Sequence, residues 1–147
     1  MRKVVALRPT LVVRFVHENP YFSEVEARVT AGPWSALTSA NTDLLALLNG
    51  ARGLLAWAAR PEGTFDFDTG DPIFGHFALR WSPANRPGQL ACRITIDSGD
   101  DGTRDSGRHL SLKLRTDPAL VERFCRQLIA VAETRVGEAV LTASEGC

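Results

Sequence analysis

Four short runs of alternating apolar and polar residues follow one another between residues 63 and 116, and this pattern limits the fold more than any other feature of the chain. Successive side chains of a β-strand point to opposite faces of a sheet, so each run predicts a strand with one buried and one exposed face. The connectors between the runs are rich in residues typical of turns. The runs therefore predict an antiparallel meander with two chemically different faces.

The two faces of this predicted meander differ sharply in character. The apolar face consists of Phe65, Phe67, Phe77, Leu79, Trp81, Leu90, Cys92, Ile94, Ile96, Leu110, Leu112 and Leu114. The other face carries Asp66, Asp68, His76, Arg80, Arg93, Thr95, Asp97, His109, Ser111, Lys113 and Arg115. The apolar face has to be covered by other elements, whereas the charged face is free to serve a function.

Two segments with helical spacing supply this cover. Leucine and alanine recur at helical intervals between residues 44 and 58, and Asn41 or Thr42 can cap the start of that helix. Asp117 caps a second helix with Pro118 at its first position, and Gly137 ends it. We expect both helices to pack on the same apolar face of the sheet.

Two glycines, Gly50 and Gly53, interrupt the first predicted helix, where each costs about 1 kcal/mol relative to alanine. Close packing of the helix against the sheet is one explanation. A notch that admits a ligand is the other, and it predicts a cavity between this helix and the sheet.

The segments at the two ends of the chain complete the predicted fold. Residues 11–16 and 22–30 predict a hairpin of two strands, and residues 34–40 fit either a strand or a loop. The prediction is an α+β fold in two layers, with a mostly antiparallel six-stranded sheet, two helices on one face and the element order ββαββββα. A single domain spans residues 1–136, residues 137–147 form a flexible C-terminal tail, and the sequence contains no detectable internal repeat.

Charge and composition exclude several classes of partner. The 17 basic and 17 acidic side chains give a net charge of zero, whereas domains that bind nucleic acid are usually basic. No apolar stretch reaches the roughly 20 residues that a membrane-spanning helix needs. The cysteines at 92, 125 and 147 are odd in number and widely spaced, so they indicate neither a disulfide framework nor a zinc site. We expect a cytoplasmic protein, monomer or homodimer, that binds neither nucleic acid nor membrane.

Turn lengths predict which charged side chains of the meander lie opposite one another. If Asp68 faces Phe74, the resulting row is Asp66, His76, Arg93 and Lys113. An aspartate and a histidine beside an arginine are able to act as a general base with an anion clamp, but a solvated sheet face has the same appearance. No serine or cysteine accompanies the pair, so we predict no catalytic residue, and an enzymatic activity is left open. The candidate partner-binding residues are Asp66, His76, Arg80, Arg93, Lys113 and Arg115.

The histidines do not predict a metal site. In this register His109 lies opposite Asp97, two strands from His76 and in a different row, so the imidazoles are more than about 10 Å apart. They cannot then share one ion, and we expect neither a metal nor a cofactor.

The order of elements over about residues 11–135, with the strand FGHFALRW at 74–81 and the helix start DPALVERF at 117–124, resembles small actinobacterial proteins in families of unknown function. Some of these are similar to the WapI-like immunity proteins of polymorphic-toxin systems. The resemblance implies a cytoplasmic inhibitor that binds a toxin domain and performs no chemistry, and it carries over no functional residues.

Two functions therefore compete at this point. The first is a non-enzymatic module that binds a protein through the charged sheet face, with the acidic loop at 98–107 as a second candidate contact. The second is a small-ligand or hydrolytic domain with a pocket between the first helix and the sheet.

Overall fold

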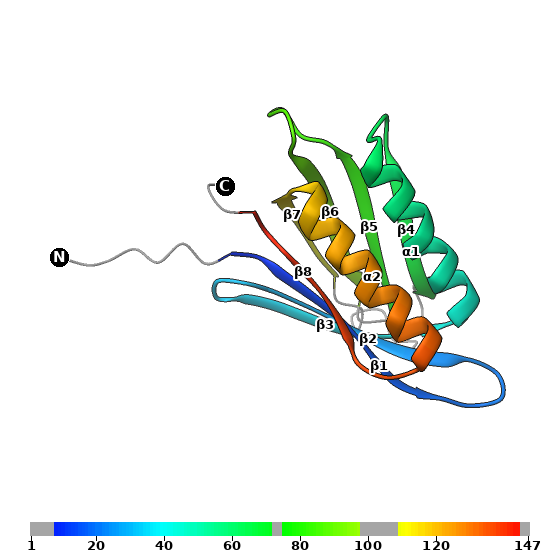
Figure 1. Cartoon of the computed structure of the whole chain (residues 1–147). Coiled ribbons are helices and arrows are strands. Elements are labelled where there is room, and N and C mark those ends of the chain that lie inside the picture. The colour runs from blue at the N-terminus through cyan, green and yellow to red at the C-terminus, as the bar shows by residue number, and fades with distance from the viewer. Residues whose placement is uncertain (1–7, 72–74, 98–108, 145–147) are drawn as a thin grey trace.

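Two four-stranded antiparallel sheets and two helices make up the fold in the computed structural model, which describes residues 8–71, 75–97 and 109–144 (Figure 1). Sheet A has the strand order β3-β2-β1-β8, and sheet B has the order β4-β5-β6-β7. The two helices lie side by side, α1 contacts β4, and α2 contacts β8 and β1. In chain order the elements are β1 (Thr10–Glu18), β2 (Ser23–Ala31), β3 (Trp34–Thr42), α1 (Leu44–Ala59), β4 (Phe65–Asp71), β5 (Gly75–Pro83), β6 (Leu90–Asp97), β7 (His109–Thr116), α2 (Pro118–Thr134) and β8 (Glu138–Thr142).

The chain consists of two halves with the same topology. In each half a three-stranded meander is followed by a helix and a fourth strand: β1, β2, β3, α1 and β4 in the first half, and β5, β6, β7, α2 and β8 in the second. The fourth strand of each half pairs with the first strand of the other half, because β4 lies beside β5 and β8 lies beside β1. This exchange of strands interlocks the halves into one unit.

The equivalence extends to single residues in the helices. A threonine ends the third strand of each half, and the aspartate after it, Asp43 or Asp117, caps the following helix with its side chain. The fourth, eighth, eleventh and fifteenth residues after each aspartate are buried in both helices. These pairs are Leu47 and Val121, Ala51 and Cys125, Leu54 and Leu128, and Ala58 and Ala132. The two helices therefore present the same face to the interior.

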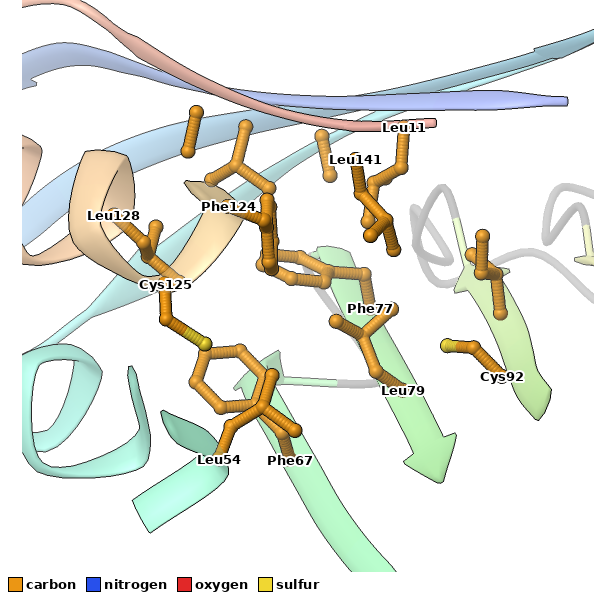
Figure 2. Close-up of a cluster of buried hydrophobic side chains, with 14 of the residues drawn as sticks. Leu11, Leu54, Phe67, Phe77, Leu79, Cys92, Phe124, Cys125, Leu128 and Leu141 are labelled. Atoms are coloured by element: carbon orange, nitrogen blue, oxygen red, sulfur yellow. The ribbon is translucent and has the colours of Figure 1, made fainter. Parts of the chain in front are cut away.

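Both sheets and both helices share a single apolar core. Figure 2 shows Phe124 of α2 and Phe77 of β5 in this cluster, together with Leu11 and Leu141 from sheet A. In sheet B the predicted apolar face is confirmed: Phe77, Leu79, Trp81 and their neighbours on β6 and β7 point inward and are buried or half-buried. Alternation thus predicted correctly which side chains form the core.

The predicted single six-stranded sheet and the element order ββαββββα are wrong, because the eight described strands form two separate four-stranded sheets. Two of these strands are not among the six predicted, and one of the two fits either a strand or a loop by its sequence. Residues 34–42 form β3, whose run of small and polar residues gives only a weak strand pattern. Residues 138–142 form β8, within the segment predicted to be a tail, and Ala139 and Leu141 are fully buried there. A five-residue strand after a glycine near the chain end carries little periodic signal, so tertiary contacts decide its structure.

The two glycines of α1 are explained by close packing. A Cβ atom on Gly50 would overlap the ring of Phe67, and one on Gly53 would lie 2.9 Å from Cζ of Phe65. The rings of β4 occupy the space in front of α1, so no open notch exists at these two positions. The aromatic rings therefore fill the space beside Gly50 and Gly53 in which the sequence suggested a ligand pocket.

Candidate functional site

The face of sheet B that points away from the core is the candidate site. Its polar side chains come from alternate positions of β4, β5, β6 and β7, and cross-strand pairing arranges them in rows. One row consists of Asp66, Arg80, Arg93 and Lys113, each directly opposite the next. We call this row the basic row. Four of the six predicted partner-binding residues thus lie together.

The predicted row was wrong at one position, because Arg80 rather than His76 lies opposite Asp66. The prediction placed a turn at residues 69–72, where Thr69, Gly70, Asp71 and Pro72 read as turn residues. In the structure β4 continues to Asp71, which pairs with Gly75, so the register shifts by four residues. The predicted pairing of Arg93 with Lys113 is confirmed.

The basic row carries more positive than negative charge. Asp66 and Arg80 lie at one end of the row, where Oδ1 of Asp66 is 3.7 Å from Nε of Arg80. Both side chains are about two-thirds exposed to solvent. Arg93 donates through Nη1 to Oγ of Ser111 at 3.4 Å. Among the described residues, no carboxylate forms an ion pair with Arg93 or Lys113. Like charges directly opposite one another destabilise a sheet, so the row carries a cost in stability.

The equivalent row of sheet A shows that the fold does not require this cost. Ser39 is equivalent to Lys113, because each precedes the threonine that ends its strand by three residues. The row of sheet A that begins at Ser39 continues across the strands with Glu26, Arg14 and Glu138. There the signs alternate, and Nη2 of Arg14 lies 3.2 Å from Oε1 of Glu26. At the position equivalent to Glu26, sheet B has Arg93. The positive excess therefore arises from the sequence of the second half and not from its topology.

His76 and His109 lie in a second row, on either side of Asp97. Nδ1 of His109 is 2.7 Å from Oδ1 of Asp97, and Nδ1 of His76 is 3.5 Å from Oδ2. The predicted pairing of His109 with Asp97 is confirmed, but His76 shares this row instead of lying opposite Asp66. Asp97 thus approaches both imidazoles, a relationship that sequence reasoning missed because its register was wrong.

The histidine row thus consists of two imidazoles on either side of one carboxylate. Nδ1 of His76 is buried, and it makes no hydrogen bond to any residue that the structure describes. Thr38 of β3 donates to the main-chain oxygen of Asp97 at 2.6 Å, which fixes the end of β6. Within the described ranges, no set of three or more histidine, cysteine, aspartate or glutamate side chains is placed to hold a metal ion.

The last predicted residue, Arg115, lies opposite Ala91, one row beyond Lys113 on the same face. It extends the basic row towards the end of β7. The acidic loop that the sequence suggested as a second contact, at 98–107, lies outside the described residues.

Comparisons with models of protein families, with curated proteins and with solved structures find no match for the chain. Neither of the two helices described is both long enough and apolar enough to cross a membrane. A function for the chain therefore has to be inferred from the geometry of the site.

Proposed function

We propose that this chain is a non-enzymatic binding protein that holds an acidic protein partner on the outer face of sheet B. The contact surface consists of Arg80, Arg93 and Lys113 of the basic row, with Arg115 beside it. The histidine row with Asp97 lies on the same face, two rows away, and extends the surface that a partner would cover.

The observation that carries this proposal is the run of like charges across β5, β6 and β7. Arg80, Arg93 and Lys113 lie directly opposite one another, although sheet A shows that the same architecture accepts alternating charges. A partner that supplies carboxylates would neutralise the run, and charge complementarity of this kind speeds association and selects the correct partner.

The finer proposal is that the partner is a toxin domain and that the chain neutralises it in the cytoplasm. The resemblance to immunity proteins that the sequence suggests over about residues 11–135 is the basis of this finer proposal. In that case the partner's gene lies next to the gene for this chain, and the partner presents an acidic surface.

The test measures the affinity for the purified product of a neighbouring toxin-like gene by calorimetry. The double variant Arg93→Glu with Lys113→Glu should bind about 10- to 100-fold more weakly, equivalent to about 1.4–2.8 kcal/mol. The matched control, Arg28→Glu with Arg123→Glu, makes the same change in charge on exposed residues of sheet A and α2 and should bind normally.

Salt dependence supplies a second readout. Affinity of the unmodified chain should fall as ionic strength rises, and the basic-row variant should lose most of this dependence. If the basic-row variant binds normally while the control binds weakly, the proposed face is incorrect.

A further inference from the structure

The edge strands β3 of sheet A and β7 of sheet B are equivalent, but they differ in which elements pack against them. β3, at the edge of sheet A, packs against β4, β5 and β6, and Thr38 bonds to the end of β6. β7 is the equivalent edge strand of sheet B, and within the described residues its one extensive neighbour is β6. Near the end of β7, the N–H of Ser144 donates to the main-chain oxygen of Arg115 at 3.0 Å. No described strand therefore pairs with the outer edge of β7 from His109 to Leu114.

Hydrogen bonding in the sheet shows which main-chain groups of β7 point outward. The N–H of Ala84 donates to the oxygen of Gln89, and alternation along the antiparallel pair makes Arg80 and Arg93 a hydrogen-bonded pair. Arg93 therefore directs its main-chain groups to β5, and Lys113 directs its own away from β6. The bond from Ser144 to Arg115 agrees, because Arg115 and Lys113 have the same parity. Ser111 and Lys113 thus direct their N–H and C=O groups outward, where no other described strand pairs with them.

The side chains along this edge define the chemistry of an added strand. On the outer face Lys113 is exposed and Ser111 is its neighbour two residues earlier. On the inner face Leu110 and Leu112 are only half-buried, although they pack against the core. A strand added beside β7 would place alternate residues over these two faces. Acidic residues would complement Lys113, and apolar residues would cover the leucines.

We propose that the partner adds an extended acidic segment to β7, antiparallel to it, with carboxylates on the outer face and apolar side chains on the inner face. This inference rests on the proposed function and specifies how the partner binds. Main-chain hydrogen bonds would supply affinity, and the alternating side chains would supply specificity.

The composition of the edges argues against two copies of this chain pairing through β7. β7 has no acidic residue, so a second β7 would bring only neutral and positive side chains into contact. The acidic edge strand β4, with Asp66 and Asp68 on its outer face, is a rival occupant. However, Thr42 of β3 bonds to Thr69 of β4, and Gly70 lies against Ala40, so β3 already covers the end of β4.

The test uses a synthetic peptide, acetyl-Val-Glu-Val-Asp-Val-Glu-Val-amide, with binding followed by amide chemical shifts of β7. Acidic residues opposite Ser111 and Lys113 would direct their N–H groups towards β7, whereas the valines would direct theirs away. Methylation of the acidic residues' main-chain nitrogens should weaken binding at least tenfold. Methylation of the valine nitrogens is the matched control and should change it less than about threefold. A peptide with lysine in place of the acidic residues should not bind.

Equal binding of the two methylated peptides, or no binding up to about 1 mM, which corresponds to only about −4 kcal/mol, would overturn the edge inference. So would self-association of the chain that Asp66→Lys with Asp68→Lys abolishes, because the occupant would then be a second copy. If the peptide fails while the basic-row variant still loses its partner, the proposed function stands and only the edge inference is incorrect.

Discussion

Thr42 and Thr116 occupy equivalent positions in the two halves of the chain, and each binds the strand that returns from its own helix. The hydroxyl of Thr42 bonds to that of Thr69 in β4, and the hydroxyl of Thr116 donates to the main-chain oxygen of Thr142 in β8 at 3.0 Å. Both threonines are buried, and each precedes the aspartate that caps a helix. Buried polar groups require such partners, so each bond fixes the junction between strand, helix and exchanged strand.

This two-fold relationship predicts that the chain tolerates circular permutation. Thr10 pairs with Thr142, and Ala143 donates to the main-chain oxygen of Pro9 at 3.2 Å, at the place equivalent to the connection between β4 and β5. A permutant that joins Ser144 to Arg8 through a short glycine-serine linker and opens between Asp71 and Gly75 should therefore fold. We expect its free energy of unfolding to fall by no more than about 2 kcal/mol, measured by urea denaturation.

The permutant should also have the same molecular mass in solution as the parent chain. Light scattering checks this, because an exchange of strands between two chains would double the mass. An unfolded or doubled product would contradict the equivalence of the two junctions.

Sequence patterns predicted the local structure well and the pairing between distant segments poorly. The alternation of β5, β6 and β7 and the cap formed by Asp117 are visible in the sequence because each depends on near neighbours. The exchange of β4 and β8 cannot be predicted from sequence patterns, since no local feature indicates that Glu138 will lie opposite Arg14. The sequence predicted three of the four residues of the basic row correctly. The fourth was wrong because the turn between β4 and β5 was placed too early, which put His76 where Arg80 lies.

Gly50→Ala is predicted to destabilise the fold, although alanine favours helices. Gly50→Ala gains about 1 kcal/mol of helix propensity but forces a methyl group onto the ring of Phe67, which is buried. Overpacking of this kind costs about 1–3 kcal/mol, so we expect a net loss in the free energy of unfolding. Gly50→Ala combined with Phe67→Leu should be more stable than Phe67→Leu alone, as measured by urea denaturation. If Gly50→Ala changed the free energy of unfolding by the same amount with Phe67 as with Leu at position 67, the two side chains would not be in direct contact.

Cys125 is predicted to make stability fall at alkaline pH. Burial raises the pKa of its thiol from the ordinary 9.0 to about 12, the carboxylate of Glu122 adds to the rise, and the guanidinium of Arg126 opposes it. Below pH 9 the thiol is neutral in both the folded and the unfolded state, so it contributes no pH dependence. Between pH 9 and about 12 only the unfolded chain releases the proton, and the free energy of unfolding should fall by about 1.4 kcal/mol per pH unit.

The control for this prediction is Cys125→Ala, which introduces the residue found at the equivalent position 51 of α1. Its stability should be lower at pH 8 because a buried side chain is shortened, but its fall between pH 9 and 10.5 should be less steep than that of the parent chain. Parallel curves for the two proteins would show that the thiol of Cys125 is not the group responsible.

Arg93→Glu is predicted to stabilise the fold while it removes the binding surface. The substitution gives the basic row the alternating signs that Glu138, Arg14 and Glu26 have in sheet A. Because the row is exposed, we expect a gain of only about 0.5–1 kcal/mol, or about 1–4 °C in Tm, at low ionic strength. Glu26→Arg makes the opposite change in sheet A and should lose a similar amount. Salt at about 1 M should shrink both differences. A destabilised Arg93→Glu protein would mean that Arg93 serves the fold, and the case for a surface kept positive for a partner would fail.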